Sequence, residues 1–304
     1  MLFRSQTLIH MQSQNFLKHL PIIFSGLLML FLSGCASSPV NISHEPSQQN
    51  LSFLIKKGNE HWDKRNDIND AKKACFYYAQ ALKGDANNSD LCIKMSRALY
   101  FQAMFIEKDP FVKDSLYFQG YQVAIKSLKN RPKFDELFSQ AEGDSLQRWL
   151  SLISEAPKEW VPALFWWAVN EARYLNTKPV LARLEKRELL EVIMHRIISL
   201  EPGYYYGGPY RFFGAFYTRI PGIELSQAQS YFEQAISAFP LYLGSHVYMA
   251  EFYHQKAGNR EQFHEILDKV ISTDLSLLTE NIPENIYYQK RAIFLLEQES
   301  VLFE

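Results

Sequence analysis

A Gly-Gly-Pro turn followed closely by an arginine is the segment whose residue types best suit binding chemistry. Gly207 and Gly208 permit backbone angles closed to other residues, so the chain can approach a ligand closely there, and Pro209 can begin a helix. Arg211 would then lie in the first turn of that helix, where the helix dipole disfavours a cation. The sequence therefore predicts a partner for Arg211, either the acid of a buried salt bridge or an anionic ligand.

Two further candidates stand four residues apart on one predicted helix. Trp166 and Asn170 share a helical face at that spacing. An asparagine beside an indole can orient a carboxylate or a carbonyl group in a cavity, and the alternative is an asparagine satisfied within the core. Tyr206 belongs to a run of three tyrosines that either wall a pocket or pack at a helix junction.

No sequence motif supports catalysis or metal binding. His-Glu-x-x-His, closely spaced cysteine pairs, Gly-x-Ser-x-Gly and Gly-x-x-x-x-Gly-Lys are absent, and the eight histidines are scattered. We therefore expect a protein that is not an enzyme and has neither a metal nor a cofactor. Lys and Arg total 32 against 33 Asp and Glu, so the weak net charge gives no support to nucleic-acid binding.

The N-terminus indicates export and anchoring. An uncharged apolar run from Ile22 to Leu32 is too short to span a bilayer and is typical of a signal peptide. It ends in Leu32-Ser33-Gly34-Cys35, which resembles the lipobox of bacterial lipoproteins, whose thiol receives a diacylglycerol. We predict that residues 1–34 are removed and that Cys35 carries a lasting lipid anchor. The alternative is an uncleaved signal anchor with a chance cysteine.

The residues after Cys35 indicate the membrane to which the lipid anchor attaches the protein. No aspartate follows the cysteine, and the lipoprotein resemblance then implies the periplasmic face of the outer membrane. Residues 35–50 are rich in Ser, Pro, Asn and Gln and predict a flexible tether, whereas residues 51–304 are expected to form a helical-repeat domain. The sequence leaves open whether translation starts at Met1 or at Met11.

Successive helices are indicated from Leu51 onward, because apolar residues recur at spacings of three and four between prolines and glycines. One pattern of four residues, separated from one another by four, three and five positions, occurs four times, and we call each copy a ladder. Its first three residues share a helical face, and the fourth marks the helix end. The copies are Ala74-Tyr78-Ala81-Ala86, Gly120-Ala124-Ser127-Pro132, Leu190-Met194-Ile197-Pro202 and Ala228-Phe232-Ala235-Pro240.

The last ladder resembles the second helix of a tetratricopeptide repeat, with small, aromatic, small and proline residues in turn. We therefore predict an all-α fold of degenerate tetratricopeptide-like helical hairpins stacked into a compact solenoid. Such a stack has a concave surface for ligands or peptides. Cys75 and Cys92 are expected to lie out of register across a helix turn near Ala86, so two buried thiols are preferred to a disulfide.

The segment Tyr205-Tyr206-Gly207-Gly208-Pro209-x-Arg211-x-x-Gly214 resembles the signature of the TRAP transporter T-component (TatT) family of periplasmic lipoproteins. The likeness extends from Asn59 to Leu296. Other matching segments are Trp62-Asp63-Lys64-Arg65, Met95-Ser96-Arg97, Ala163 to Asn170, Tyr231 to Ile236, Ala250 to Tyr253 and Ile282-Pro283-Glu284-Asn285.

This resemblance implies an accessory subunit of a TRAP-type solute uptake system, without catalysis. The subunit would dock the solute-binding (P) subunit and hold a small organic ligand in a helical pore. The resemblance also adds Arg97 as a binding candidate, with a surface or paired arginine as the alternative. The alternative function is a general tetratricopeptide scaffold lipoprotein that recruits envelope proteins. The sequence leaves open the solute and the oligomeric state, a homo-oligomer included.

Overall fold

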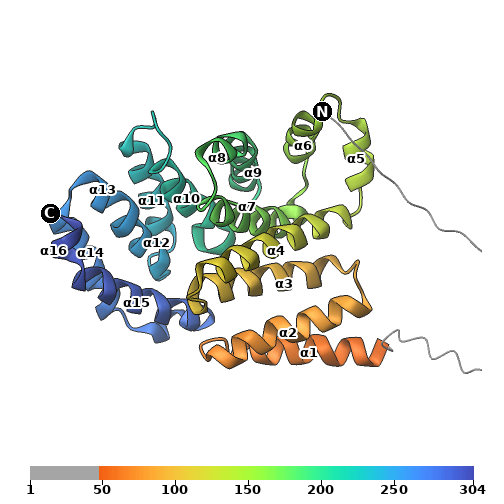
Figure 1. Ribbon diagram of the computed structural model, residues 1–304, viewed down its shortest axis with the longest axis horizontal. Coiled ribbons are helices and arrows are strands. Elements are labelled where there is room, and N and C mark those ends of the chain that lie inside the picture. Colours follow the sequence, from red (N-terminus) through yellow and green to blue (C-terminus); the bar gives the residue numbers. More distant parts are fainter. Residues whose placement is uncertain (1–47) are drawn as a thin grey trace, which may run out of the picture. The chain divides into compact units, whose positions relative to one another are not determined.

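The computed structural model describes residues 48–304, and every regular element in this range is a helix (Figure 1). The predicted all-α class is thereby confirmed, and the packing of the helices is consistent with a helical solenoid. The signal peptide, Cys35 and most of the tether lie outside the described residues. The first helix begins at Gln48, three residues before the predicted start of the domain.

The N-terminal helices pack as antiparallel neighbours, and Figure 1 shows α1 to α4 lying in successive layers. Asp67, Asn88 and Asp109 each begin a helix by accepting backbone N–H groups with their side chains, as capping residues do. The elements are α1 (Gln48–Asp63), α2 (Ile68–Gly84), α3 (Ser89–Phe101), the π-helix η1 (Gln102–Ile106), α4 (Pro110–Lys129), α5 (Phe134–Gln140), α6 (Ser145–Ser154), η2 (Lys158–Trp160) and α7 (Val161–Leu175).

The C-terminal helices continue the stack, with α10 packed on α11 and α14 on α15. A second π-helix, η3, follows α12 without a break. The elements are α8 (Val180–Glu185), α9 (Arg187–Leu200), α10 (Tyr204–Tyr217), α11 (Leu225–Ala238), α12 (Leu243–Tyr248), η3 (Met249–His254), α13 (Gln255–Ala257), α14 (Arg260–Ser272), η4 (Leu275–Asn281), α15 (Ile282–Glu297) and α16 (Glu299–Leu302).

The four sequence ladders fall on α2, α4, α9 and α11, and the first three residues of each are buried. Each helix ends two or three residues before the fourth ladder position. Small residues allow close contact, since a Cβ added at Gly120 would lie 2.4 Å from Oδ1 of Asn170 on α7. The ladders therefore mark the buried faces of the helices, while the likeness to tetratricopeptide repeats stays a prediction.

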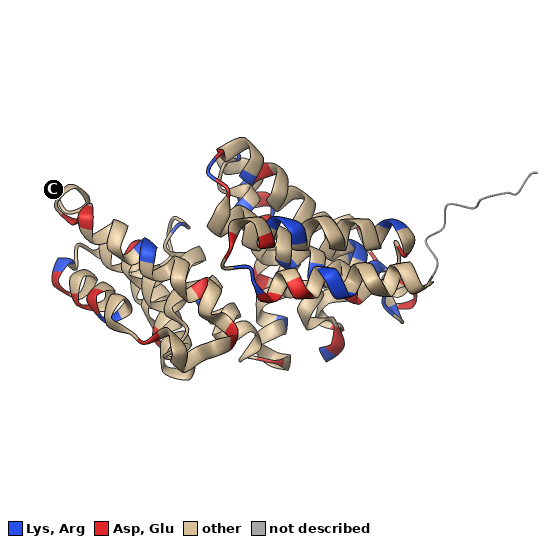
Figure 2. Cartoon of the chain, turned by 90° about the horizontal axis from the view of Figure 1, so that it is seen from below, with Lys and Arg blue, Asp and Glu red and all other residues tan. Residues whose placement is uncertain are grey.

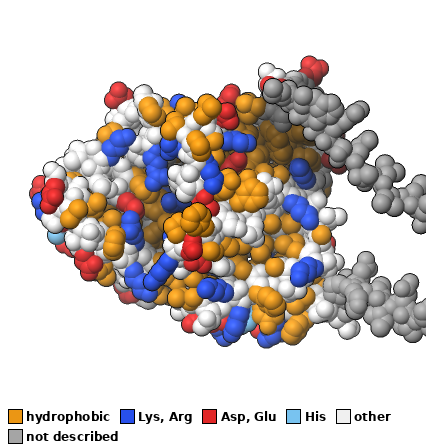
Figure 3. Space-filling view, viewed as in Figure 1, with side chains coloured by type: hydrophobic (Ala, Val, Ile, Leu, Met, Phe, Trp, Pro, Cys, Tyr) orange, Lys and Arg blue, Asp and Glu red, His pale blue; other side chains and the backbone are white. Residues whose placement is uncertain are grey.

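The largest buried cluster surrounds α7, whose Trp166 and Trp167 are almost completely buried. Cys75 and Cys92 are buried and unpaired, as predicted. Figure 2 shows basic and acidic residues intermixed along the helices. Hydrophobic side chains also reach the surface between charged ones (Figure 3), and the most exposed of them is Phe111.

Candidate functional site

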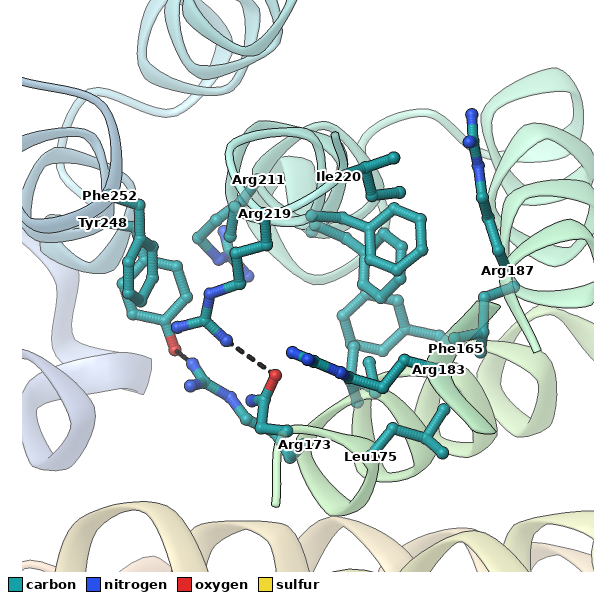
Figure 4. Close-up of a pocket in the computed structure, with 18 of the residues that line it drawn as sticks. Phe165, Arg173, Leu175, Arg183, Arg187, Arg211, Arg219, Ile220, Tyr248 and Phe252 are labelled. Carbon is teal, nitrogen blue, oxygen red and sulfur yellow. Dashed lines mark hydrogen bonds between the residues drawn. The ribbon is translucent and has the colours of Figure 1, made fainter. Parts of the chain in front are cut away.

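A cavity of about 230 Å³ lies among α7, α8, α9, α10 and η3 (Figure 4). Aromatic rings form much of its wall, among them Phe165, Trp166, Tyr205 and Tyr242. The rings of Trp166 and Tyr205 are packed edge to face with centroids 4.9 Å apart. Burial raises the pKa of Tyr205 and of Tyr242, so both hydroxyls stay neutral. The wall is therefore mainly apolar.

The polar part of the wall is strongly cationic. Among the described residues, no aspartate or glutamate lines the cavity. Five arginines do: Arg173, Arg183, Arg187, Arg211 and Arg219. Of the five, Arg187 alone forms an ion pair with a described residue, since its Nε lies 3.0 Å from Oε1 of Glu191. The other four have no carboxylate within ion-pair distance in residues 48–304. Unpaired arginines around one apolar space favour an anionic occupant.

Arg211 is buried at the base of this wall, and carbonyl groups hold its guanidinium. Nη1 donates to the Tyr206 carbonyl at 3.0 Å and to the Ser245 hydroxyl at 3.3 Å, and Nη2 donates to the Tyr205 carbonyl at 3.2 Å. The guanidinium also stacks on the Tyr242 ring, 4.4 Å from its centroid. The predicted salt bridge of Arg211 is wrong, since the backbone of the preceding turn takes the place of an acid.

That turn is left-handed over three successive residues. Tyr205, Tyr206 and Gly207 have φ values of 46°, 58° and 69°. The left-handed conformation suits glycine but costs other residues roughly 1 to 2 kcal/mol each. Glycine is needed next as well, because a Cβ at Gly208 would lie 2.5 Å from Cε2 of Phe165. The regular part of α10 starts only after this turn, close to Pro209.

The outer part of the cavity is formed by Arg173, Arg183 and Arg219, whose side chains point into one space in Figure 4. Arg173 donates to the hydroxyl of Tyr248. Nη1 of Arg219 donates to Oδ1 of Asn176 at 2.7 Å. Partial burial and the nearby charge of Arg173 lower the pKa of Arg219. An anion in this space would relieve the repulsion between the two arginines.

Three of the seven predicted binding residues line the cavity, namely Trp166, Gly208 and Arg211. Asn170 is fully buried beside it and donates to the Trp166 carbonyl at 2.8 Å and to the Ser96 hydroxyl at 3.2 Å. The structure thus brings Asn170 next to Trp166 but turns its amide toward α3.

Arg97, Tyr206 and Gly207 lie behind the cavity wall. The Arg97 guanidinium lies 4.8 Å from the centroid of the Trp62 ring and 5.2 Å from that of the Tyr205 ring. Gly207 packs against α11, and the Tyr206 hydroxyl donates to Oε2 of Glu280 at 2.8 Å. A role for any of the seven residues as a ligand contact stays a prediction.

Of the five cavity arginines the sequence predicted only Arg211, and Arg187 was missed together with the three outer ones, Arg173, Arg183 and Arg219. The three outer arginines come from α7, α8 and the segment after α10, so no local spacing joins them. Of the missed arginines, only Arg173 could have been predicted from sequence spacing. It follows Trp166 by seven residues and therefore shares its helical face.

A second cavity of about 560 Å³ adjoins the first. Both are lined by Arg173 and Tyr248, so the hydrogen bond between these residues lies at their common boundary. Residues of both π-helices, Phe105 of η1 and Phe252 of η3, contribute to the second wall. Segments of π-helix are frequent at functional sites, which is consistent with a functional role for this boundary.

The fold and the cavity define an all-α protein whose helices pack as in a solenoid around a cationic internal cavity. Residues 113–303 match the TRAP transporter T-component family, TAtT, and the chain belongs to this family. No match is found among curated proteins. The protein is therefore a TRAP transporter accessory component, from a family of transport subunits and not of enzymes. None of the helices within residues 48–304 is long and apolar enough to cross a membrane.

Proposed function

We propose that the protein is a periplasmic accessory subunit of a TRAP-type uptake system, anchored through Cys35 at the outer membrane. In this role it docks the solute-binding (P) subunit and holds a small organic anion in its cavity. Family membership supports the association with TRAP subunits. The observation that carries the ligand proposal is a cavity wall in which the described part of the chain places five arginines and no acid.

The wall chemistry favours a ligand with two parts. An apolar body fits against Phe165 and Trp166, where burial of apolar surface provides affinity. A carboxylate or similar oxyanion fits the arginines, because a guanidinium binds a planar anion through two parallel hydrogen bonds. In this arrangement Arg211 is the anion's inner partner, and Arg173 and Arg219 are its outer partners.

The second cavity supports a pore rather than a closed pocket. Its wall includes two carboxylates: Asp114, which lies 2.7 Å from Lys178 outside the wall, and Glu251, which lies 2.6 Å from Arg291. The other charged wall residues are basic, namely Lys113, Arg173 and Lys290. Because of the two carboxylates, this wall offers an anion less attraction than the first cavity does. A ligand that moves between the two has to displace the contact between Arg173 and Tyr248.

Docking is tested with a tagged Cys35→Ala protein, which lacks the lipid anchor, as bait in a periplasmic extract. Recovery of a TRAP solute-binding subunit supports the proposal. Enrichment of envelope assembly factors without that subunit supports the alternative of a general scaffold lipoprotein. A matched bait carrying Leu181→Asp asks whether the exposed apolar side chain of α8, beside the cavity, takes part in docking.

A further inference from the structure

We infer that Glu284 positions Arg211 for its ligand, and that it acts through the left-handed turn at residues 205–207. The inference rests on the proposed function, in which Arg211 binds the anion. Glu284 lies in the first turn of α15 and does not line the cavity. Its effect on the ligand must therefore pass through other residues.

The carboxylate of Glu284 is fully buried and held from several sides. Arg65 donates to it twice, from Nη2 to Oε2 at 2.7 Å and from Nε to Oε1 at 3.1 Å. The Tyr205 hydroxyl donates to Oε1 at 3.4 Å, and Nη2 of Arg97 lies 3.8 Å from the same oxygen. The bidentate contact with Arg65 holds the Glu284 carboxylate in one orientation, so its Oε1 is a fixed acceptor for the Tyr205 hydroxyl.

The turn needs such support because two of its three residues are tyrosines in a conformation that favours glycine. Strained backbone of this kind persists only where its surroundings hold it. Here the two side chains reach the same part of the chain, since Tyr205 donates to Glu284 and Tyr206 to Glu280. The end of η4, through Glu280, and the start of α15, through Glu284, thus hold the turn from outside the cavity.

On its other side the turn presents two carbonyl oxygens to Arg211. Pro209 has no N–H, so the Tyr205 carbonyl has no helical donor four residues ahead and accepts from Arg211 instead. Three of the five guanidinium donors are used by the turn and by Ser245. The donors left over are the Nε–H and one N–H of Nη2, which belong to the edge that binds a carboxylate bidentately.

Through these contacts Glu284 fixes the side chain of Tyr205, and the carbonyl of Tyr205 orients Arg211. If the hydroxyl of Tyr205 loses its acceptor, the left-handed turn relaxes and its carbonyl groups no longer fix the guanidinium. The free edge of Arg211 then samples several directions, and the ligand has to order it on binding. A weaker affinity follows, although neither Glu284 nor the hydroxyl touches the ligand.

The test is a double-mutant cycle on the full-length protein, with 2-naphthoate as the probe and calorimetry as the readout. Tyr205→Phe removes only the hydroxyl and is the main variant, and Glu284→Gln is the second. We expect each to weaken 2-naphthoate binding about fivefold, the effect of one lost hydrogen bond. In an Arg211→Ala background we expect no further loss. Tyr253→Phe removes a hydroxyl bonded to Gln229 outside this network and serves as the control.

An equal loss of affinity from Tyr205→Phe with and without Arg211 would overturn the inference. If Arg211→Ala itself leaves 2-naphthoate binding unchanged, the anion proposal fails instead. The positioning is then still measured without ligand, by NMR of the Arg211 side chain. We expect rotation about its Nε–Cζ bond to be slow in the wild type and faster in Tyr205→Phe, and equal rates would contradict the inference.

Discussion

Nη2 of Arg65 lies 2.7 Å from Oε2 of Glu284, although 219 positions separate the two residues in the sequence. Arg65 follows the first helix, and Glu284 belongs to α15 near the C-terminus. Their side chains are 5% and 0% exposed. The pair therefore joins the two ends of the helical stack through a buried ion pair.

Replacement of Arg65 by alanine should strongly destabilise the protein. It leaves the Glu284 carboxylate buried with only the more distant Arg97 as counter-charge, and loss of one partner of a buried pair typically costs about 3 to 5 kcal/mol. Urea unfolding followed by circular dichroism measures the change. Arg260→Ala is the control and should have a smaller effect, because the Arg260 side chain is 57% exposed and His264 still lies 2.7 Å from the Glu299 carboxylate. Equal losses in the two variants would contradict the buried role of Arg65.

Gly207→Ala should destabilise the protein more than Gly258→Ala does. Both glycines have left-handed φ values, 69° and 72°. A Cβ at Gly207 would lie 3.3 Å from the Cα of Ala235, whereas one at Gly258 meets nothing within 4 Å. We expect about 1 kcal/mol for Gly258→Ala from the backbone conformation alone and a larger loss at Gly207. Thermal unfolding of the two variants compares them directly, and the reverse order would refute the close packing of the turn on α11.

Phe232→Ala tests the fourth ladder. Phe232 is completely buried in α11, so its truncation should lower the free energy of unfolding by roughly 3 to 5 kcal/mol. Phe111→Ala, at a side chain that is 87% exposed, should change it very little. A small effect at both positions in chemical denaturation would mean that the ladder does not mark a packed face.

Acid should weaken the fold in part through His246. Burial lowers the pKa of this histidine below its ordinary value, and its Nε2 lies 2.9 Å from the Pro240 carbonyl. Because the unfolded chain binds the proton more tightly, the stabilisation is complete above about pH 6.5 and is lost as the pH falls toward the lowered pKa. The slope for one such group is at most about 1.4 kcal/mol per pH unit.

The measurement is urea unfolding of the wild type and of His246→Gln at several values between pH 5 and pH 7.5. We expect the wild type to lose more stability than the variant on acidification. His254, whose pKa burial also lowers, is present in both proteins and cancels in the comparison. Parallel curves would show that His246 does not contribute.

Much of the fold follows from local sequence patterns. The ladders predicted buried faces because helical spacing is a local property, and small residues such as Gly120 and Ala228 mark where helices approach. The sequence also predicted unusual backbone angles at Gly207 and Gly208, and Gly207 has a φ of 69°. Gly208 is needed for a different reason, because a side chain there would collide with Phe165. These features depend on neighbours in the sequence or on residue size alone.

The rest depends on contacts between distant segments. A left-handed tyrosine is locally unfavourable, so nothing near Tyr205 predicts its φ of 46°, which is supported by Glu284 79 positions away. The same turn explains why Arg211 lacks the acidic partner that was one of the two alternatives predicted for it, because the carbonyl groups of Tyr205 and Tyr206 accept from its guanidinium. The cationic wall likewise combines arginines from separate helices and appears only once these are packed together.

The most direct test of an anion-binding accessory subunit is to identify what the protein carries. The full-length protein is extracted from its membrane in mild detergent, and released small molecules are identified by mass spectrometry for the wild type, Arg211→Ala and the control Arg260→Ala. We predict an organic anion that both the wild type and the control retain and that folded Arg211→Ala has lost. The same small-molecule content in all three proteins, or no anion in any of them, would contradict the account.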